Sequence, residues 1–528
     1  MSDRRVRVIR RRSEADENEI VELLDQTVRV AFREGTPLWR HQILALALVD
    51  LLGRLFPRIE LVVSDEEPAD ADLPPGAALL RERLEEARSH ASVPPLKPGA
   101  GAAVTIAVGD VDVDADIYVD GYGWQSYIGA TPAAFADDAG PAVSVGPLTA
   151  ACRAASQALQ RVMGDRLVRT TAIESIDAGY WSGLTYEVGG EPLVEPDIAP
   201  PSQINAVLVG GGSIGGAVAY LLARVPGLVG ELDVVDPQAL EDKNPDRALL
   251  ATRELAAAEA VKAEVVRDAL AHHGGLTVTL HRTTMAGFIA ARAREATLPL
   301  VLSAVDSVRS RREIQDALPL QLVDAACNPD EISVSGHRTD DGPCIYCLHI
   351  ENVLNSDQIR LRLIMRATGF NRNRVLAFLF DHTLLEDQHL REIEVHRGEP
   401  EGAYADYQGE ELDMLYRKEL LYGETKVKTA SGAEAAVASP FVTALAGFLL
   451  AGEGLKMGGG SAYAPYRLGA LGELPTMYRE SLFGSPADRL LLPVERWAGN
   501  ECLCRSSRRL RLLRERYGLG QEDTPQRR

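Results

Sequence analysis

INAVLVGGGSIGGAVAYLLARV, residues 204–225, has the sequence pattern of a strand, a glycine turn and a helix. The apolar run from Ile204 predicts a buried strand, and the apolar spacing after the glycines predicts a helix. Gly210, Gly212 and Gly215 match G-x-G-x-x-G, in which the glycines allow a tight turn, backbone approach to phosphate and close helix packing. The helix N-terminus adds its dipole and free N–H groups to anion binding. The stretch predicts a Rossmann-like nucleotide site that suits NAD, FAD or ATP equally.

A carboxylate follows the next expected strand. ELDVVD ends at Asp236, where an acidic side chain accepts hydrogen bonds from ribose hydroxyls. This position also fits NAD binding. The alternative is a purely structural role for Asp236, as the cap of a turn or helix.

The residues that follow favour a triphosphate with a metal over a dinucleotide. EDKNPDR places Asn244 three residues before Arg247, Lys262 lies on an expected helix, and Asp306 ends the apolar strand LPLVLSAVD. Arg247 and Lys262 can neutralise phosphate charge, and Asp306 can hold Mg²⁺ directly or through water. Each alone suits a solvated surface charge. Together we expect Arg247, Lys262 and Asp306 to be catalytic and, with Asn244, to bind nucleotide.

These motifs resemble the E1/ThiF/MoeB/HesA superfamily of ubiquitin-like-protein activating enzymes. GGGSIG, VVD, NPDR, AVDS and Lys262 in EAVKAEVV match in order, with about two extra residues before the lysine. SPFVTALAGFLLAGEGLK is similar to the late helix of the same domain. The resemblance implies that ATP and Mg²⁺ bind, and that the C-terminal glycine of a ubiquitin-like partner attacks the α-phosphate as pyrophosphate leaves.

The build is most similar to the E1 of bacterial ubiquitin-like conjugation operons, some of which act in antiphage defence. That resemblance implies a ubiquitin-like protein as partner and allows an E2-like protein as a second one. One alternative is a sulfur-carrier-protein adenylyltransferase of the ThiF/MoeB type, but those enzymes are usually shorter and lack an inactive half. Two alternatives belong to other classes. The first is an NAD-dependent oxidoreductase, which would give Arg247 and Lys262 no role. The second is a catalytically inactive adaptor, which would not need the complete set of motifs found here.

Alternating strands and helices predict an α/β fold of two tandem Rossmann-like domains. We expect an inactive Rossmann-like domain at 1–190, a linker at 191–203, and a mostly helical insertion at 350–430. The active adenylation domain takes residues 204–349 and 431–528. The linker is rich in proline and acidic residues, which resist regular structure.

The first domain carries no phosphate-binding loop. The turn after its first strand, REGTPLWRH, holds a single glycine, so we expect no nucleotide there. Within the superfamily this domain resembles the inactive half of two-lobed E1 enzymes. The basic run Arg4–Arg12 is either a solvated tail or, as the resemblance implies, the source of an arginine that reaches a nucleotide phosphate.

Composition excludes other classes of protein. The net charge of −20 gives no indication of a nucleic-acid partner. No run approaches the ~20 apolar residues of a membrane span, and MSDRRVRVIRRRSEADENE lacks the apolar stretch of a secretory signal. We expect a cytoplasmic protein, either a monomer with a pseudo-dimeric pair of domains or a homodimer.

Four of the six cysteines form two close pairs, Cys344-x-x-Cys347 and Cys502-x-Cys504. Two such pairs can meet as a tetrahedral, structural Zn²⁺ site, in which four thiolates leave no open position for chemistry. The alternative is two sets of buried thiols.

Cys152 and Cys327 remain as thiols for a thioester. Cys152 lies on an apolar helix face and is expected in the core. Cys327, in LVDAACNPDE, is the thioester candidate in the active domain, although a small buried thiol is the alternative. Bacterial relatives resemble this chain but carry a Cys-Gly step where Tyr422-Gly423 stands here. We therefore expect adenylation without a thioester.

Overall fold

The computed structural model describes most of the chain. The described residues are 6–8, 14–32, 38–71, 73–91, 101–133, 135, 143–167, 178–293, 296–328, 331–340, 342–348, 361, 364–365, 368–380, 383–397, 401–412, 415, 424–428, 434–469, 477–483, 489–494 and 503–519. Within them, the strands form sheets of seven, eight and three members.

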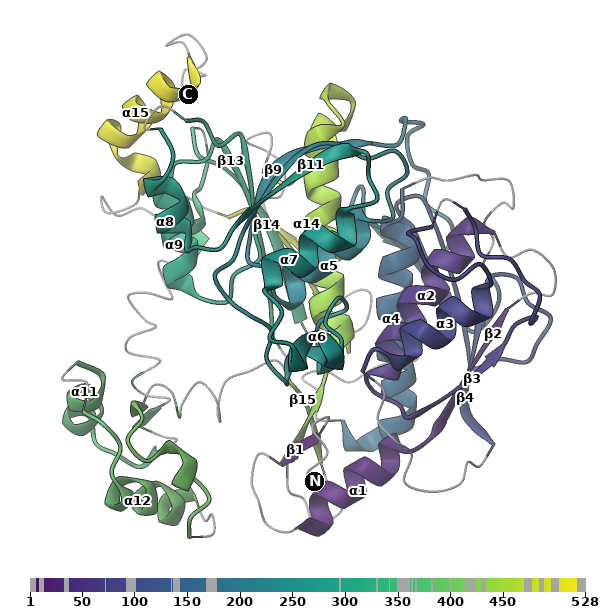
Figure 1. Ribbon diagram of the computed structural model, residues 1–528, viewed down its shortest axis with the longest axis horizontal. Helices are drawn as coiled ribbons and strands as arrows, with labels where there is room; N and C mark the ends of the chain where they lie inside the picture. The colour runs from purple at the N-terminus through teal and green to yellow at the C-terminus, as the bar shows by residue number, and fades with distance from the viewer. Residues whose placement is uncertain are drawn as a thin grey trace.

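The first half folds around the seven-stranded sheet, in the order β3-β2-β4-β5-β6-β7-β8 (Figure 1). Strands β2 to β5 pair in parallel, and β6, β7 and β8 continue antiparallel. The elements are α1 (Glu14–Leu24), β2 (Thr27–Phe32), α2 (Trp39–Gly53), β3 (Arg58–Val62), α3 (Leu80–Ser89), β4 (Ala102–Val108), β5 (Ile117–Tyr122), β6 (Gln125–Gly129), α4 (Val145–Met163), β7 (Ala178–Ser182) and β8 (Val188–Gly189).

The second half is built on the eight-stranded sheet, in the order β11-β10-β9-β12-β13-β14-β17-β18. In this order, the strands from β11 through β10, β9 and β12 to β13 pair in parallel. Strands β14, β17 and β18 continue the sheet with antiparallel pairing. Its elements are β9 (Gln203–Val209), α5 (Ser213–Leu222), β10 (Val229–Val235), α6 (Arg253–Ala257), α7 (Lys262–Leu270), β11 (Gly275–His281), α8 (Met285–Ala290), β12 (Leu300–Ser303), α9 (Val308–Asp316), β13 (Gln321–Cys327), β14 (Glu331–Arg338), α14 (Pro440–Gly458), β17 (Met477–Ser481), β18 (Leu490–Leu492) and α15 (Ser507–Tyr517).

Both large sheets follow one plan. Parallel pairing changes to antiparallel at a single junction, β5 with β6 in the first sheet and β13 with β14 in the second. A 19-residue helix then follows each junction in the chain: α4 lies between β6 and β7, and α14 between β14 and β17. The predicted α/β class with two Rossmann-like sheets is confirmed.

Some details of this fold have no clear local signal in the sequence. Strands β6, β7 and β8 are short and lack a clear alternation of apolar and polar residues. Helix α4 begins at Val145, and Gly146 and Pro147 fit inside its first turn, where a proline loses no helical hydrogen bond. Residues 191–202, in the expected linker, form no helix or strand.

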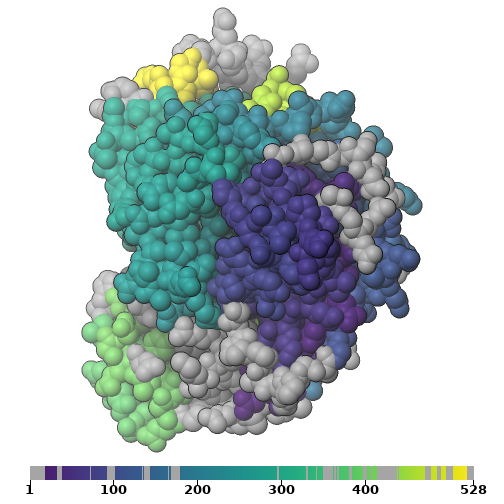
Figure 2. Space-filling model, turned by 45° about the vertical axis from the view of Figure 1, so that its right-hand side comes forward, coloured from purple at the N-terminus to yellow at the C-terminus, as the bar shows by residue number. Residues whose placement is uncertain are grey.

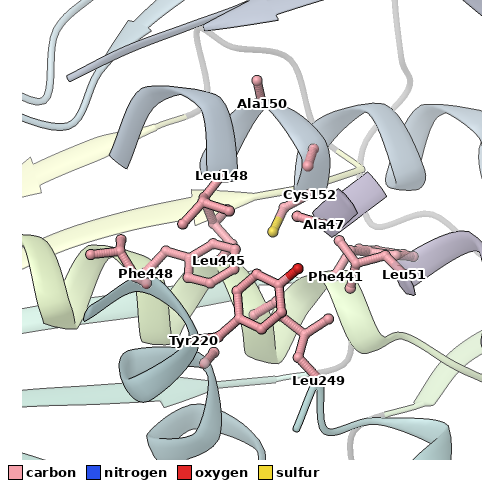
Figure 3. Packing of buried hydrophobic residues seen from close by; sticks show 14 of the residues in the cluster. Ala47, Leu51, Leu148, Ala150, Cys152, Tyr220, Leu249, Phe441, Leu445 and Phe448 are labelled. Atoms are coloured by element: carbon pink, nitrogen blue, oxygen red, sulfur yellow. The ribbon is translucent and has the colours of Figure 1, made fainter. Parts of the chain in front are cut away.

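The two halves share one apolar core. Helices α2 and α4 of the first half meet α5 and α14 of the second (Figure 3). Tyr220 lies in the middle of this layer, between Cys152 of α4 and Phe448 of α14, with Leu249 beside it. The surface also runs unbroken from the purple half onto the teal half (Figure 2).

The chain between β14 and α14 holds two further features. Helices α11 (Arg372–Phe380) and α12 (Asp387–Arg397) lie close together (Figure 1). They have their own apolar core, which includes Phe370 and Leu412. Both helices lie within residues 350–430, where we expect a mostly helical insertion, and the bounds of that insertion stay a prediction. Strands β15 (Glu424–Lys428) and β16 (Glu434–Ala438) follow, and β1 (Val6–Val8) pairs with β16.

Among the described residues, α14 has the length and apolar composition of a membrane span, and 83% of that window is buried inside the protein. Its sequence, PFVTALAGFLLAGEGLKMG, matches the core helix expected from the sequence. Burial within the fold accounts for its apolar character.

Candidate nucleotide site

The glycine turn lies at the carboxyl end of β9. Gly210 has a φ of +97°, which favours glycine, and a Cβ there would lie 2.6 Å from the carbonyl oxygen of Ala304. A Cβ on Gly215 would lie 1.8 Å from the carbonyl oxygen of Gly210. Gly212 is the N-cap of α5 and offers no side chain to its first N–H groups. The positive φ and the close packing therefore account for the glycines at 210 and 215, and phosphate binding by this turn stays a prediction.

Asp236 ties this turn to the end of β10. Its Oδ2 accepts a 2.6 Å hydrogen bond from the N–H of Gly211, and its Oδ1 accepts a 2.7 Å bond from the N–H of Gln238. The side chain is buried. The turn-capping role that sequence analysis left as the alternative is thus present in the structure. Ribose binding by Asp236 stays a prediction.

Lys262 lies against the same turn. It is the first residue of α7 and is only 6% exposed. A Cβ on Gly211 would lie 3.2 Å from the Cβ of Lys262. The ammonium group donates a 2.8 Å hydrogen bond to Oε1 of Gln238. Three elements distant in sequence therefore bring Gly211, Asp236 and Lys262 together.

Sequence analysis missed Gln238, whose side chain accepts from Lys262. The signal available was its place two residues after the predicted ribose carboxylate, at the same strand end. The backbone also joins this residue to the lysine, because the N–H of Lys262 donates 3.0 Å to the Gln238 carbonyl. Gln238 thus holds both the backbone N–H and the side-chain ammonium group of Lys262.

Asn244 and Arg247 lie in a short 3₁₀ turn and the loop after it. Oδ1 of Asn244 accepts a 2.7 Å hydrogen bond from the N–H of Glu241. The carbonyl of Arg247 accepts a 3.0 Å bond from Oγ1 of Thr443, on α14. Arg247 is partly buried, and its charge acts on the thiol of Cys327. The loop therefore lies at the same carboxyl edge of the sheet as β13.

Asp306 follows β12, the strand next to β9 in the sheet. The segment that leads to it passes the glycine turn, as the contact between Gly210 and Ala304 shows. Asp306 is exposed and directly precedes Ser307, the N-cap of α9. Because its side chain is exposed, the Asp306 carboxylate is accessible to a cation from solvent.

A buried ion pair supports the strand ends beneath these residues. Nε of Arg311 donates to Oδ1 and Oδ2 of Asp324 at 2.8 and 2.9 Å, and Oγ of Ser303 donates 2.6 Å to Oδ1. The pair joins α9, β12 and β13. Sequence analysis did not single out these residues, because nothing in a charged helix such as VRSRREIQD marks one arginine as buried.

Cys327 ends β13 and is partly buried. Burial raises the pKa of its thiol to about 11, and the charges of Arg311 and Arg247 offset only part of that rise. The thiolate, which is the nucleophile, is therefore scarce near neutral pH. Cys152 is fully buried in the shared core, as expected, and burial also raises the pKa of that thiol.

Three of the four predicted metal ligands come together. Sγ of Cys347 lies 3.9 Å from Sγ of Cys344 and 3.5 Å from Sγ of Cys504, and all three cysteines are buried. Buried thiols in this arrangement fit a soft metal such as Zn²⁺. Cys502, like Tyr422 and Gly423, lies outside the described residues.

In the first half, the start of α2 and the end of β5 meet in a buried polar cluster. His41, in the first turn of α2, packs against Gly109, and its Nε2 lies 3.1 Å from Oδ1 of Asp120. Nε of Arg40 donates to the same oxygen at 3.4 Å. Burial opposes ionisation of Asp120, but His41 and Arg40 outweigh it and hold its pKa below the ordinary value. His41 and Arg40 thus offset the cost of burying the Asp120 carboxylate.

Comparison with known proteins places these motifs in context. The profile of the ThiF family matches residues 201–466, half of the chain. The uncharacterized protein y4jF of Sinorhizobium fredii (strain NBRC 101917 / NGR234) is 25% identical over 510 residues, covering 93% of this chain and 92% of that protein.

Two solved structures are similar to part of this chain at low sequence identity. E. coli MccB with ATP is 14% identical, with a TM-score of 0.33, covering 57% of this chain and 66% of that chain. TcdA (CsdL) is 16% identical, with a TM-score of 0.29, covering 49% and 87%. The chain spans about half to two thirds of the length of the MccB structures it matches.

Proposed function

We propose that this chain, which belongs to the ThiF family, uses ATP to adenylate the C-terminal glycine of a ubiquitin-like protein. The proposal is an E1-like activity of a bacterial ubiquitin-like conjugation system. One observation carries the proposal: Gly211, Asp236 and Lys262 lie together at the carboxyl end of the parallel strands. The N–H groups of a glycine turn and a lysine ammonium group suit phosphate, and a carboxylate at a strand end suits the ribose hydroxyls.

Each residue has a role in this proposal. The turn from Gly210 to Gly215 presents N–H groups to phosphate, and Lys262 and Arg247 neutralise the charge that grows as the reaction proceeds. Asn244 and Asp236 hold the nucleotide, and Asp306 would hold Mg²⁺. The partner's carboxylate oxygen bonds to the α-phosphorus, and the bond to the leaving pyrophosphate breaks. Positioning and charge neutralisation supply most of the catalysis.

We further propose that the reaction on this chain stops at the adenylate. The raised pKa of Cys327 supports this, since a thiol that stays protonated is a poor nucleophile. An E2-like protein would then receive the activated partner without a thioester on Cys327.

The cysteine cluster has a structural role in the proposal. With Zn²⁺, Cys344 and Cys347 would hold the segment after β14 to Cys504, which precedes α15. Helix α15 is also held by Tyr517, whose hydroxyl donates 2.9 Å to the carbonyl of Leu298. Four thiolates, with Cys502 as the fourth, would leave no position open for catalysis.

Titration calorimetry with purified full-length chain tests the nucleotide class. We expect MgATP to bind and NAD⁺ not to bind, and Arg247→Ala to weaken MgATP binding. Binding of NAD⁺ in preference to MgATP would contradict the proposal and favour the oxidoreductase alternative.

A further inference from the structure

Arg54 belongs to the first half of the chain but bonds to the loop that carries Arg247. It caps the C-terminal end of α2, and its side chain is 0% exposed. Nη2 donates 2.8 Å to the carbonyl of Leu249, and Nη1 donates 3.2 Å to the carbonyl of Ala251. Nη1 also donates to the carbonyl of Pro245. One side chain therefore fixes three carbonyls on both sides of Arg247.

Asp50, one helical turn earlier, balances the charge of Arg54. Oδ1 of Asp50 accepts from Nε and Nη2 of Arg54 at 3.1 and 2.8 Å, and Asp50 is also buried. Oδ2 of Asp50 lies 3.4 Å from Nδ1 of His90, at the end of α3. Contacts within the first half of the chain therefore fix the guanidinium of Arg54 in the position from which it bonds to the loop.

The loop depends on partners outside itself. Residues 248–252 form no helix or strand, so their buried carbonyls need other donors. Leu249 packs beside Tyr220 in the shared core (Figure 3). The N–H of Arg253 donates 3.2 Å to the carbonyl of His90. A planar guanidinium with five donors suits this task better than any other side chain.

We propose that Arg54 is a positioning residue for the nucleotide site. By fixing the carbonyls of Pro245, Leu249 and Ala251, it sets where Asn244 and Arg247 stand relative to the glycine turn. The first half of the chain thereby acts on the site of the second half through a buried side chain, without touching nucleotide. This inference rests on the proposed function, because it assumes that Arg247 meets the nucleotide.

The experiment compares MgATP affinity among full-length variants by titration calorimetry. Arg54→Met removes the donors while keeping apolar volume, and Arg54→Lys keeps the charge with fewer donors. The matched control is Arg153→Met, because Arg153 is also buried and joins the halves, but bonds to Glu480 and Ser126 instead. Melting temperatures show how much stability each variant loses.

We expect Arg54→Met to raise the Kd for MgATP about tenfold or more, since small misplacements of binding groups are costly. Arg54→Lys should recover part of the affinity, and Arg153→Met should bind within about twofold of wild type at the same fraction folded, because its contacts lie outside the loop. Hydrogen–deuterium exchange without nucleotide should be faster at residues 248–252 in Arg54→Met only. If Arg54→Met fails to fold, Arg54→Lys and Asp50→Asn carry the same comparison.

Two negative results are distinguishable. If wild type binds MgATP, Arg247→Ala does not, and folded Arg54 variants bind as wild type, the inference is overturned while the proposed function stands. If wild type binds no MgATP, the proposed function fails and takes the inference with it. Equal losses of affinity in Arg54→Met and Arg153→Met would also overturn the inference, because they would show a general effect of loosening the two halves.

Discussion

The N–H of Gly211 donates a 2.6 Å hydrogen bond to Oδ2 of Asp236, so the glycine turn after β9 and the end of β10 form one rigid unit. The bond joins two residues that are 25 positions apart in the chain, and it satisfies a buried N–H of the turn. It also places Gln238, and through it Lys262, at a fixed position beside the turn.

Lys262→Ala should weaken MgATP binding strongly, because it removes the buried cation beside the turn. We expect the Kd to rise about tenfold or more, because a hydrogen bond to a charged group contributes about 1.5–3 kcal/mol. Calorimetry measures it. Lys243→Ala is the control, since Lys243 is an exposed lysine paired with Glu241. Equal affinity in wild type and Lys262→Ala would remove Lys262 from the site.

The cysteine cluster should hold one Zn²⁺ per chain. Cys347→Ser should release the metal and lower the melting temperature, because a structural site contributes its binding free energy to folding. Elemental analysis and thermal unfolding check this, with Cys327→Ala expected to keep its zinc. A wild-type chain without stoichiometric zinc would contradict the assignment.

Cys327 should react slowly with iodoacetamide at pH 7 and faster as the pH rises. Below a pKa of about 11, the thiolate fraction grows about tenfold per pH unit. Peptide mass spectrometry can follow the rate at Cys327 itself. Rapid alkylation that levels off near pH 7 would instead mark an activated thiol and reopen the thioester question.

The raised pKa of Cys327 also affects stability. Above the ordinary thiol value of 9.0, the unfolded chain loses this proton while the folded chain keeps it, so the contribution to stability falls as the pH rises through about 11. Replacement by alanine should remove that part of the alkaline loss of stability.

The basic N-terminal run offers a test of the first half. Arg10, Arg11 and Arg12 replaced together by alanine should weaken MgATP binding while leaving the melting temperature unchanged, if one of them reaches a phosphate. This variant leaves Val6–Val8 intact, which deletion of residues 1–12 would not, and β1 pairs with β16. Unchanged affinity would make the run a solvated tail.

Much of the fold follows from local patterns in the sequence. The glycine turn, the strand before it and the apolar helix α14 are each determined by neighbouring residues, so periodicity and glycine spacing suffice to predict them. The antiparallel strands β6, β7 and β8 are short, and their pairing depends on residues far along the chain, which no local pattern reveals.

The site divides in the same way. Gly210, Asp236 and Lys262 belong to sequence motifs, and the fold brings them together at the carboxyl end of the parallel strands. Arg54 and Gln238 act through contacts that only the fold creates, since Arg54 meets a loop almost 200 residues later in the chain. A lone arginine at the end of an apolar helix gives no sign of such a partner.

ATP–pyrophosphate exchange is the measurement that tests adenylation most directly. The assay would use full-length chain, MgATP and ubiquitin-like proteins from the same genome that end in glycine. We predict exchange that requires the partner's free C-terminal carboxylate and falls about 100-fold or more in Asp306→Ala. Absence of exchange with every such partner, or full exchange by Asp306→Ala and Lys262→Ala, would contradict the account.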